Sequence, residues 1–316
     1  MAVKKLFIMS GGVGSEREVS LASGRYCADA LRESSVDFEE MIVEKDKTLL
    51  YKGEKLSEED GFSFLKRENA LVFQVIHGTY GEDGELTKKL EECGIAYIGS
   101  DSVVMKIAFD KSRAEKILKE SGMSVTESIL VRNISDIGLV RDFSLPIIIK
   151  PNKEGSSVGV IKVNEGEDLE SIVKKNLSEF GELLVQKCVV GREFTCGVLE
   201  ISGKEVALVP SEVVMEDGML FDYHAKYFVN GLEITPANVD ESMTKSIQET
   251  ALKVHKVLGC KDISRTDMIL NENDELVVLE INTIPGMTDV SFVPAEMKAS
   301  GYSLKDFIGG MVKKYS

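Results

Sequence analysis

The stretch from Ile263 to Thr288 constrains the fold most strongly, because it contains two apolar runs separated by a short polar segment. That segment is Asn271–Asp274, and Asn and Asp tolerate the positive φ angles of tight turns. A two-residue turn at Asn273 and Asp274 would place position 267 opposite 280 and position 265 opposite 282. The sequence therefore predicts a β-hairpin in this register.

Side chains alternate between the two faces of a strand, so this register gathers polar residues on one face. That face would carry Arg265, Asp267, Glu280 and Asn282. The other would carry Met268, Leu270, Leu279 and Ile281 against a core. Two carboxylates directly opposite each other repel, and a hard cation such as Mg²⁺, which binds carboxylate and amide oxygens, would remove the conflict. The alternative is a solvated face on which Arg265 pairs with a carboxylate.

Composition limits the classes of function. The 316 residues suffice for two or three domains, and the net charge of −15 without a basic tail argues against nucleic acid and anionic membranes as partners. No uninterrupted apolar run approaches about 18 residues, so we expect no membrane span. The five cysteines are scattered without a C-x-x-C pair, which favours reduced thiols and a cytoplasmic location.

Two segments near the N-terminus suggest a ligand site. A strand ending at Ser10, a Gly-rich turn and a helix from about Ser15 form a βα unit suited to anions, without the third glycine of a dinucleotide site. Glu16 would either complement the helix dipole or hold a substrate ammonium. His77 follows the apolar run Leu71–Ile76, at the strand end where open α/β sheets bind ligands, although a structural role remains the alternative.

Two lysines suggest a phosphate site. Lys111 lies in the first turn of a helix capped by Asp110, where a cation is disfavoured unless an anion binds or the side chain points into water. Lys150 ends an apolar strand and precedes the Gly- and Ser-rich loop 152–159, which could cover a phosphate or be a plain surface hairpin. His255 is predicted to lie on the surface of an amphipathic helix.

Taken together and in order, the motifs resemble those of the D-alanine–D-alanine ligases, which are ATP-grasp enzymes. The motifs are GGVGSEREVSL from Gly11, IHG from Ile76, DK from Asp110, KPNKEGSSVG from Lys150, GRE from Gly191, DYHAKY from Asp222, SRTD from Ser264 and LEINTIPGMT from Leu279, followed by Ser291. They span essentially the full chain. The resemblance implies an α/β protein with the ATP-grasp fold in three lobes: a Rossmann-like parallel-sheet domain (1–101), a central lobe with a phosphate-covering loop (102–187) and a C-terminal lobe with the metal site and a catalytic arginine (188–316).

The activity implied by the resemblance is ATP-dependent ligation of two D-alanines to D-alanyl-D-alanine through an acyl phosphate, for peptidoglycan precursors. It also implies two Mg²⁺ ions, with Mn²⁺ as a substitute, and a homodimer. Two alternatives stay open. One is the same fold with D-serine or D-lactate as acceptor, and the other is a catalytically silent nucleotide-binding regulator.

Residue roles also follow from the resemblance, position by position. Glu16 would hold the ammonium of the first D-alanine and link to Ser156 and Tyr227, while Arg265 and the N–H of Gly286 would stabilise the tetrahedral oxyanion. Ser291 would bind the carboxylate of the second substrate, His77 would orient or deprotonate its amine, and Phe292 would shape its pocket. ATP would contact Lys111, Lys150, Ser157, Gln186, Lys187, Val189, Glu193 and Lys226. The metal ligands would be Asp267, Glu280 and Asn282.

The sequence departs from the family pattern at several of these positions. Gln186 stands where Glu is usual, although its amide oxygen can still accept from the adenine amino group. Phe292 replaces a common Leu, and Gly14 a common Ser. Tyr227 favours D-alanine over D-lactate as the second substrate.

Overall fold

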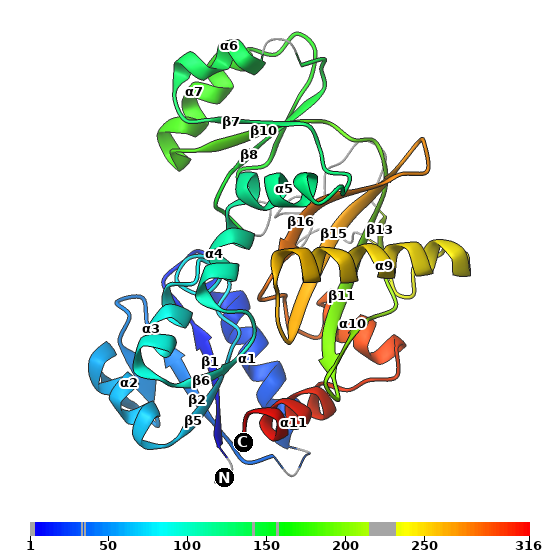
Figure 1. Cartoon of the computed structure of the whole chain (residues 1–316). Helices are drawn as coiled ribbons and strands as arrows, with labels where there is room; N and C mark the ends of the chain where they lie inside the picture. Colours follow the sequence, from blue (N-terminus) through cyan, green and yellow to red (C-terminus); the bar gives the residue numbers. More distant parts are fainter. Residues whose placement is uncertain (1–3, 33, 35, 141–142, 156–157, 215–231) are drawn as a thin grey trace.

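Three β-sheets, each accompanied by helices, make up the architecture (Figure 1). The computed structural model describes residues 4–32, 34, 36–140, 143–155, 158–214 and 232–316. Among these residues, no helix combines the length and the apolar character that crossing a membrane requires.

The first sheet has the strand order β4-β3-β2-β1-β5-β6, in which β1, β2, β5 and β6 are parallel and β3 and β4 are antiparallel additions. Its strands are β1 (Lys5–Gly11), β2 (Phe38–Val43), β3 (Leu49–Tyr51), β4 (Glu54–Leu56), β5 (Ala70–Gln74) and β6 (Ala96–Ile98). Its helices are α1 (Arg17–Arg32), α2 (Glu58–Arg67) and α3 (Glu85–Cys93).

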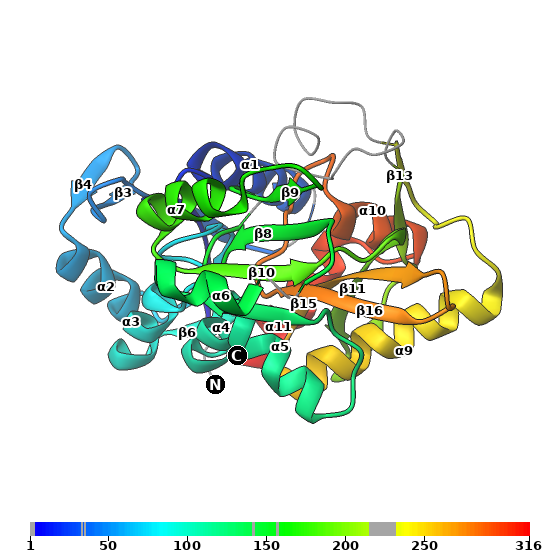
Figure 2. The same cartoon turned by 90° about the horizontal axis from the view of Figure 1, so that it is seen from above.

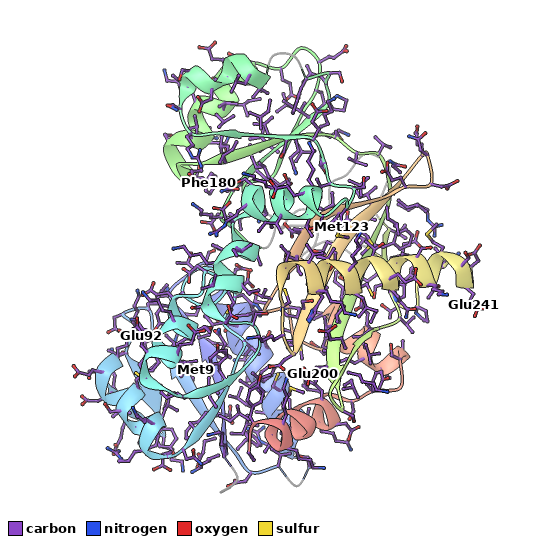
Figure 3. The ribbon with its side chains drawn as sticks, viewed as in Figure 1. Met9, Glu92, Met123, Phe180, Glu200 and Glu241 are labelled. Carbon is purple, nitrogen blue, oxygen red and sulfur yellow. The ribbon has the colours of Figure 1, made fainter. Side chains whose placement is uncertain are left out.

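Strand β1 is buried on both faces, as its uninterrupted apolar sequence requires. Leu6 and Ile8 belong to the core that α1 shares with the C-terminal helix, whereas Phe7 and Met9 belong to the core under α2 and α3. Met9 lies inside this packed layer (Figure 3). The two cores hold the parallel strands between them. Because β1 and β5 run in the same direction, the loops that follow them leave the same edge of the sheet.

The second sheet is antiparallel, in the order β7-β10-β8-β9, with its helices packed against it (Figure 2). The elements are β7 (Ser128–Val131), η1 (Ile134–Asp136), α6 (Ile137–Val140), β8 (Ile147–Pro151), β9 (Ile161–Val163), α7 (Leu169–Phe180) and β10 (Leu183–Lys187). Val173 on α7 packs with Ile147 and Ile149 of β8 and Val185 of β10. This core holds β8 and β10 side by side. Gln186 pairs with Ile148, two residues before Lys150, so Lys150 and Gln186 share one face of the sheet.

The third sheet has the order β14-β13-β11-β15-β16, with β12 paired to β11. Its strands are β11 (Gly191–Ile201), β12 (Lys204–Ala207), β13 (Ser211–Val214), β14 (Leu232–Ile234), β15 (Ile263–Asn271) and β16 (Leu276–Asn282). The remaining helices are α4 (Ser102–Phe109), α5 (Lys111–Glu120), α9 (Glu241–Leu258), α10 (Phe292–Ala299) and α11 (Leu304–Tyr315). Helices α4 and α5 share a core with α9 and β16, which places the start of α5 beside the site strands.

The predicted hairpin forms, and its register at the polar face is confirmed: Arg265 pairs with Asn282, and Asp267 pairs with Glu280. The two-residue turn is wrong. Pairing toward the tip runs one residue out of the predicted register, with Leu270 opposite Leu276. A β-bulge beyond Asp267 absorbs the difference, and Leu279 is the unpaired extra residue. Leu279 therefore does not share the core face with Met268 and lines a cavity instead.

His255 is not on the surface. It is 1% exposed, and its Nδ1 lies 2.7 Å from Ser264 Oγ on β15. The prediction failed because the amphipathic pattern of α9 continues into its last turn, where Val254, His255 and Leu258 are all buried.

Candidate active site

Two cavities border the polar face of the β15–β16 hairpin. The first lies between the second and third sheets, and the second lies between the hairpin and the loops of the first sheet. Glu280 lines both cavities, so they meet at the polar face.

Every predicted site residue that the structure describes lines one of these cavities. The first is lined by Lys111, Lys150, Gln186, Lys187, Val189, Glu193, Asp267 and Glu280. The second is lined by Glu16, His77, Arg265, Glu280, Asn282, Gly286, Ser291 and Phe292. Ser156, Ser157, Lys226 and Tyr227 lie outside the described residues.

Asp267 has three partners within the hairpin and its neighbouring strand. Arg265 donates two parallel hydrogen bonds to it, Nε to Oδ1 and Nη2 to Oδ2, each 2.8 Å long. Thr195 Oγ1 on β11 also donates to Oδ1, and Asn282 Nδ2 donates to Oδ2. Burial opposes the charge of Arg265, but Asp267 outweighs it and raises the guanidinium pKa. The two parallel hydrogen bonds fix the geometry of the pair.

Glu280 is associated with a different cation, since Lys111 Nζ lies 3.5 Å from its Oε2. The same ammonium donates to the carbonyl of Glu154, at 2.6 Å. Asp110 caps α5 by accepting from the N–H of Arg113, so Lys111 lies in the first turn as predicted. A cation in that position, directed at a carboxylate and a cavity, suits the binding of an anion.

Lys150 is a second buried cation at the same cavity. It is 7% exposed, and burial lowers the pKa of its ammonium, an effect that Glu280 opposes and Lys111 reinforces. Two neighbouring ammonium groups in a cavity provide a strong attraction for phosphate oxygens.

The polar face offers a suitable set of ligand atoms for Mg²⁺. Among the described residues, no group of three or more His, Cys, Asp or Glu side chains could hold a metal ion. The predicted set has only two carboxylates, Asp267 and Glu280, plus the amide oxygen of Asn282. Mg²⁺ commonly binds through one or two carboxylates together with phosphate oxygens and water, so these residues fit that ion.

The far end of the first cavity is lined by β10 and the segment that follows it. Gln186 is 3% exposed, and its Nε2 donates to Glu115 Oε1 on α5. Thr126 also lines this cavity, and its hydroxyl has no hydrogen-bond partner among the described residues. An unsatisfied buried hydroxyl costs free energy, which a polar ligand in the cavity would recover.

Glu16 lies where three chain segments meet. Its carboxylate is buried, and a Cβ atom added to Gly78 or to Gly155 would lie 2.6 Å from its Oε2. A side chain at either position would displace the Glu16 carboxylate from where it lies. The loop after Lys150 consequently reaches the Glu16 carboxylate.

His77 connects the first sheet to the loop after β16. Its Nδ1 lies 3.1 Å from the carbonyl oxygen of Ile284, and its Nε2 lies 3.0 Å from Ser23 Oγ. Glu82 Oε1 lies 3.6 Å from Nδ1. Burial disfavours the imidazolium, but Glu82, Glu16 and the carbonyl of Ile284 together raise the His77 pKa above its usual value. Ser23 also accepts from the N–H of Met287, so two chain segments anchor this loop.

The loop after β16 presents backbone and hydroxyl groups to the second cavity. Ser291 Oγ accepts from the N–H of Thr288 at 3.0 Å, and a Cβ added to Gly286 would lie 2.8 Å from that oxygen. Arg265 lies over the Phe292 ring, 5.7 Å from its centroid, at the start of α10. The loop thus places Gly286 and Ser291 at the cavity that Arg265 also lines.

Sequence reasoning missed Ser23, Glu82, Glu115 and Thr126. Each contacts a predicted residue or lines a cavity, but none stands in a pattern that distinguishes it from ordinary helix, loop or strand positions. Ser23, for example, is a buried small residue on the inner face of α1.

The architecture is the ATP-grasp fold. The structure aligns over its full length with that of the VanG D-Ala:D-Ser ligase from Enterococcus faecalis, covering 100% of both chains with 29% identity and a TM-score of 0.85. It also aligns with D-alanyl-alanine synthetase A from Vibrio cholerae, covering 100% of this chain and 99% of the other at a TM-score of 0.84; at 23% identity this likeness concerns the fold alone.

Sequence comparison specifies the family. The sequence model described as D-ala D-ala ligase C-terminus matches residues 117–313. The chain is 34% identical to D-alanine–D-alanine ligase of Bacteroides fragilis, covering 98% of each protein, and 36% identical to D-alanine–D-alanine ligase B of Mesorhizobium japonicum, covering 100% of this chain and 99% of the relative. The chain belongs to the D-alanine–D-alanine ligase family.

Proposed function

We propose that this protein uses ATP to join two molecules of D-alanine into D-alanyl-D-alanine, a precursor of peptidoglycan. The observation that carries the proposal is the position of Glu280, which lines both cavities at the polar face. A nucleotide in the first cavity and amino acids in the second would meet there. Family membership supports the same activity.

In the first step, the γ-phosphoryl group of ATP passes to a carboxylate oxygen of the first D-alanine, giving ADP and an acyl phosphate. Lys111 and Lys150 would bind the phosphates, while Glu16 would hold the substrate ammonium. Asp267, Glu280 and Asn282 would hold Mg²⁺, which neutralises charge on the phosphate oxygens when bound. The main contributions of these residues are position and charge.

In the second step, the amine of the second D-alanine attacks the carbonyl carbon, loses a proton, and phosphate leaves with the electrons of the C–O bond. Arg265 and the N–H of Gly286 would stabilise the tetrahedral oxyanion. Ser291 would bind the acceptor carboxylate, and Phe292 would pack beside it. Both ring nitrogens of His77 already have partners, which supports an orienting role rather than proton abstraction.

Gln186, Lys187 and Val189 would surround the adenine, and Glu193 would bind the ribose. The roles of Ser156, Ser157, Lys226 and Tyr227 remain predictions from the resemblance. So do binding of two metal ions, replacement by Mn²⁺, the homodimer, the cytoplasmic location and lobe boundaries at 101/102 and 187/188.

An assay of D-alanyl-D-alanine formation tests the proposal. Incubation with ATP, Mg²⁺ and D-alanine should give dipeptide and ADP in equal amounts, whereas L-alanine or omission of Mg²⁺ should give neither. ATP binding without D-alanine-dependent ADP formation would instead indicate the catalytically silent regulator.

D-Serine as the second substrate is the runner-up, because the aligned Enterococcus structure is that of a D-Ala:D-Ser ligase. Offering D-alanine together with D-serine or D-lactate, and identifying the products by mass, separates these acceptors. We expect D-alanyl-D-alanine as the main product, since the curated relatives at 34–36% identity are named for D-alanine alone.

A further inference from the structure

Gln186, Glu115 and Ser128 form a buried polar group behind the far end of the first cavity. Gln186 on β10 pairs across the sheet with Ser128 on β7. Glu115, 6% exposed on α5, accepts from Gln186 Nε2 through Oε1 and from Ser128 Oγ through Oε2, the latter at 2.5 Å. Of these three residues, only Gln186 lines the cavity.

This arrangement determines which end of the Gln186 amide faces the ligand. An ionised carboxylate can only accept hydrogen bonds, so the amide must turn its NH₂ group toward Glu115. Burial raises the pKa of Glu115, against the charges of Lys150 and Lys111. Both of its oxygens nevertheless accept hydrogen bonds, from Gln186 and from Ser128, as those of a carboxylate do. The carbonyl oxygen of Gln186 is then the end left for the cavity, and no hydrogen bond within the described residues uses it.

We propose that Glu115 is a specificity-determining positioning residue: by fixing the Gln186 amide, it makes the site accept a hydrogen bond from the base and thereby selects adenine. Adenine carries an amino group at position 6, whereas guanine and hypoxanthine carry a carbonyl oxygen there, which needs a donor. The inference rests on the proposed use of ATP and names how the base is chosen.

The same reasoning explains why Gln rather than Glu stands at position 186. Two carboxylates in contact at a buried site would repel, and one would have to take up a proton. In this chain the carboxylate belongs to Glu115 on α5, behind Gln186, and the amide of Gln186 faces the cavity.

The test compares ATP with ITP, whose hypoxanthine differs from adenine at position 6 without the extra amino group of guanine. Glu115→Gln releases the amide, because glutamine at 115 can donate as well as accept. The ratio of kcat/KM for ATP to that for ITP should fall by about ten- to a hundredfold. The lost charge of Glu115 acts on the phosphates of both nucleotides, so its effect cancels in the ratio.

Exchanging the two residues between positions 115 and 186 should restore the preference for ATP. In the double variant Glu115→Gln/Gln186→Glu, the amide at 115 donates to the carboxylate at 186, which can only accept from the base. The ATP/ITP ratio should therefore return to the wild-type value. Glu120→Gln, an exposed charge change at the end of the same helix, should leave the ratio unchanged.

Three readouts separate this inference from the proposed function. The KM for D-alanine and the thermal midpoint without nucleotide should stay the same in Glu115→Gln, and calorimetry should give the same ATP/ITP preference as kinetics. An unchanged ratio in Glu115→Gln, or a folded double variant without recovery, overturns the inference while leaving ligase activity intact. Base selection that depends on Glu115 without any dipeptide formation overturns the proposed function alone. A wild-type protein that binds neither nucleotide overturns both.

Discussion

Asp267 and Glu280 lie directly opposite each other on β15 and β16, yet each is associated with a different cation, Arg265 for the first and Lys111 for the second. The repulsion expected between paired carboxylates is thereby reduced without a metal ion. Both cations also face the cavities, so the ion pairs that stabilise the hairpin belong to the proposed ligand site.

Removing either carboxylate charge should abolish Mg²⁺-dependent ADP formation. Asp267→Asn and Glu280→Gln keep the side-chain size but lose a hard anionic ligand, so we expect kcat to fall by at least about a hundredfold. Thermal unfolding should remain cooperative. Near-normal turnover in either variant would contradict the metal assignment, and Asp274→Asn at the hairpin tip is the matched control.

Replacing Arg265 by Lys should reduce the chemical step more than nucleotide binding. Lysine keeps the charge but cannot make the two parallel hydrogen bonds to Asp267, so the cation loses its fixed position. We expect kcat to fall by about two orders of magnitude with a small change in the KM for ATP. Arg192→Lys, at the bidentate pair with Glu212, serves as a control. Equal losses in both variants would indicate a purely structural role for Arg265.

The contact between Glu82 and His77 should make stability depend on pH. The His77 pKa is raised in the folded state, so the stabilisation is complete below the unfolded value of 6.5 and is lost as pH rises through the folded pKa. Glu82→Gln should therefore lower the free energy of unfolding at about pH 6 and have little effect at about pH 9. Urea unfolding at both pH values measures the difference. The exposed control Glu92→Gln should change the free energy of unfolding equally at both pH values. The same pH-independent change in Glu82→Gln would refute the link between His77 and stability.

Asp262 should be a major contributor to stability. It is 1% exposed and accepts from the N–H of Gly99, Lys314 Nζ and Tyr315 Oη, each at 2.7 Å. Asp262→Ala should cost about 3 kcal/mol of unfolding free energy, because buried donors lose their charged partner. Asp274→Ala is the control, since both residues have positive φ and share the backbone penalty of alanine. Equal costs would attribute the effect to the backbone alone.

The sequence predicted the polar face of the hairpin because the period of two fixes which residues share a face. It could not predict the bulge, since the extra residue Leu279 is as apolar as its neighbours and only the observed pairing distinguishes it. The register at Asp267 and Glu280 was right although the turn was wrong, because the bulge compensates for the longer tip. The prediction for His255 was wrong for a related reason. Burial in the last turn of α9 depends on contact with β15, and the helical pattern of α9 alone does not show that contact.

The close approach of Gly78 and Gly155 to Glu16 has a mechanical consequence. Gly78 follows β5 of the first sheet and Gly155 follows β8 of the second, and the Glu16 carboxylate lies in the gap between these two glycines. If Glu16 holds the ammonium of the first substrate, as proposed, a motion that separates the first and second sheets would widen this gap and weaken the binding of that amino acid. The affinity for the first substrate would then report how closely the first and second sheets approach each other.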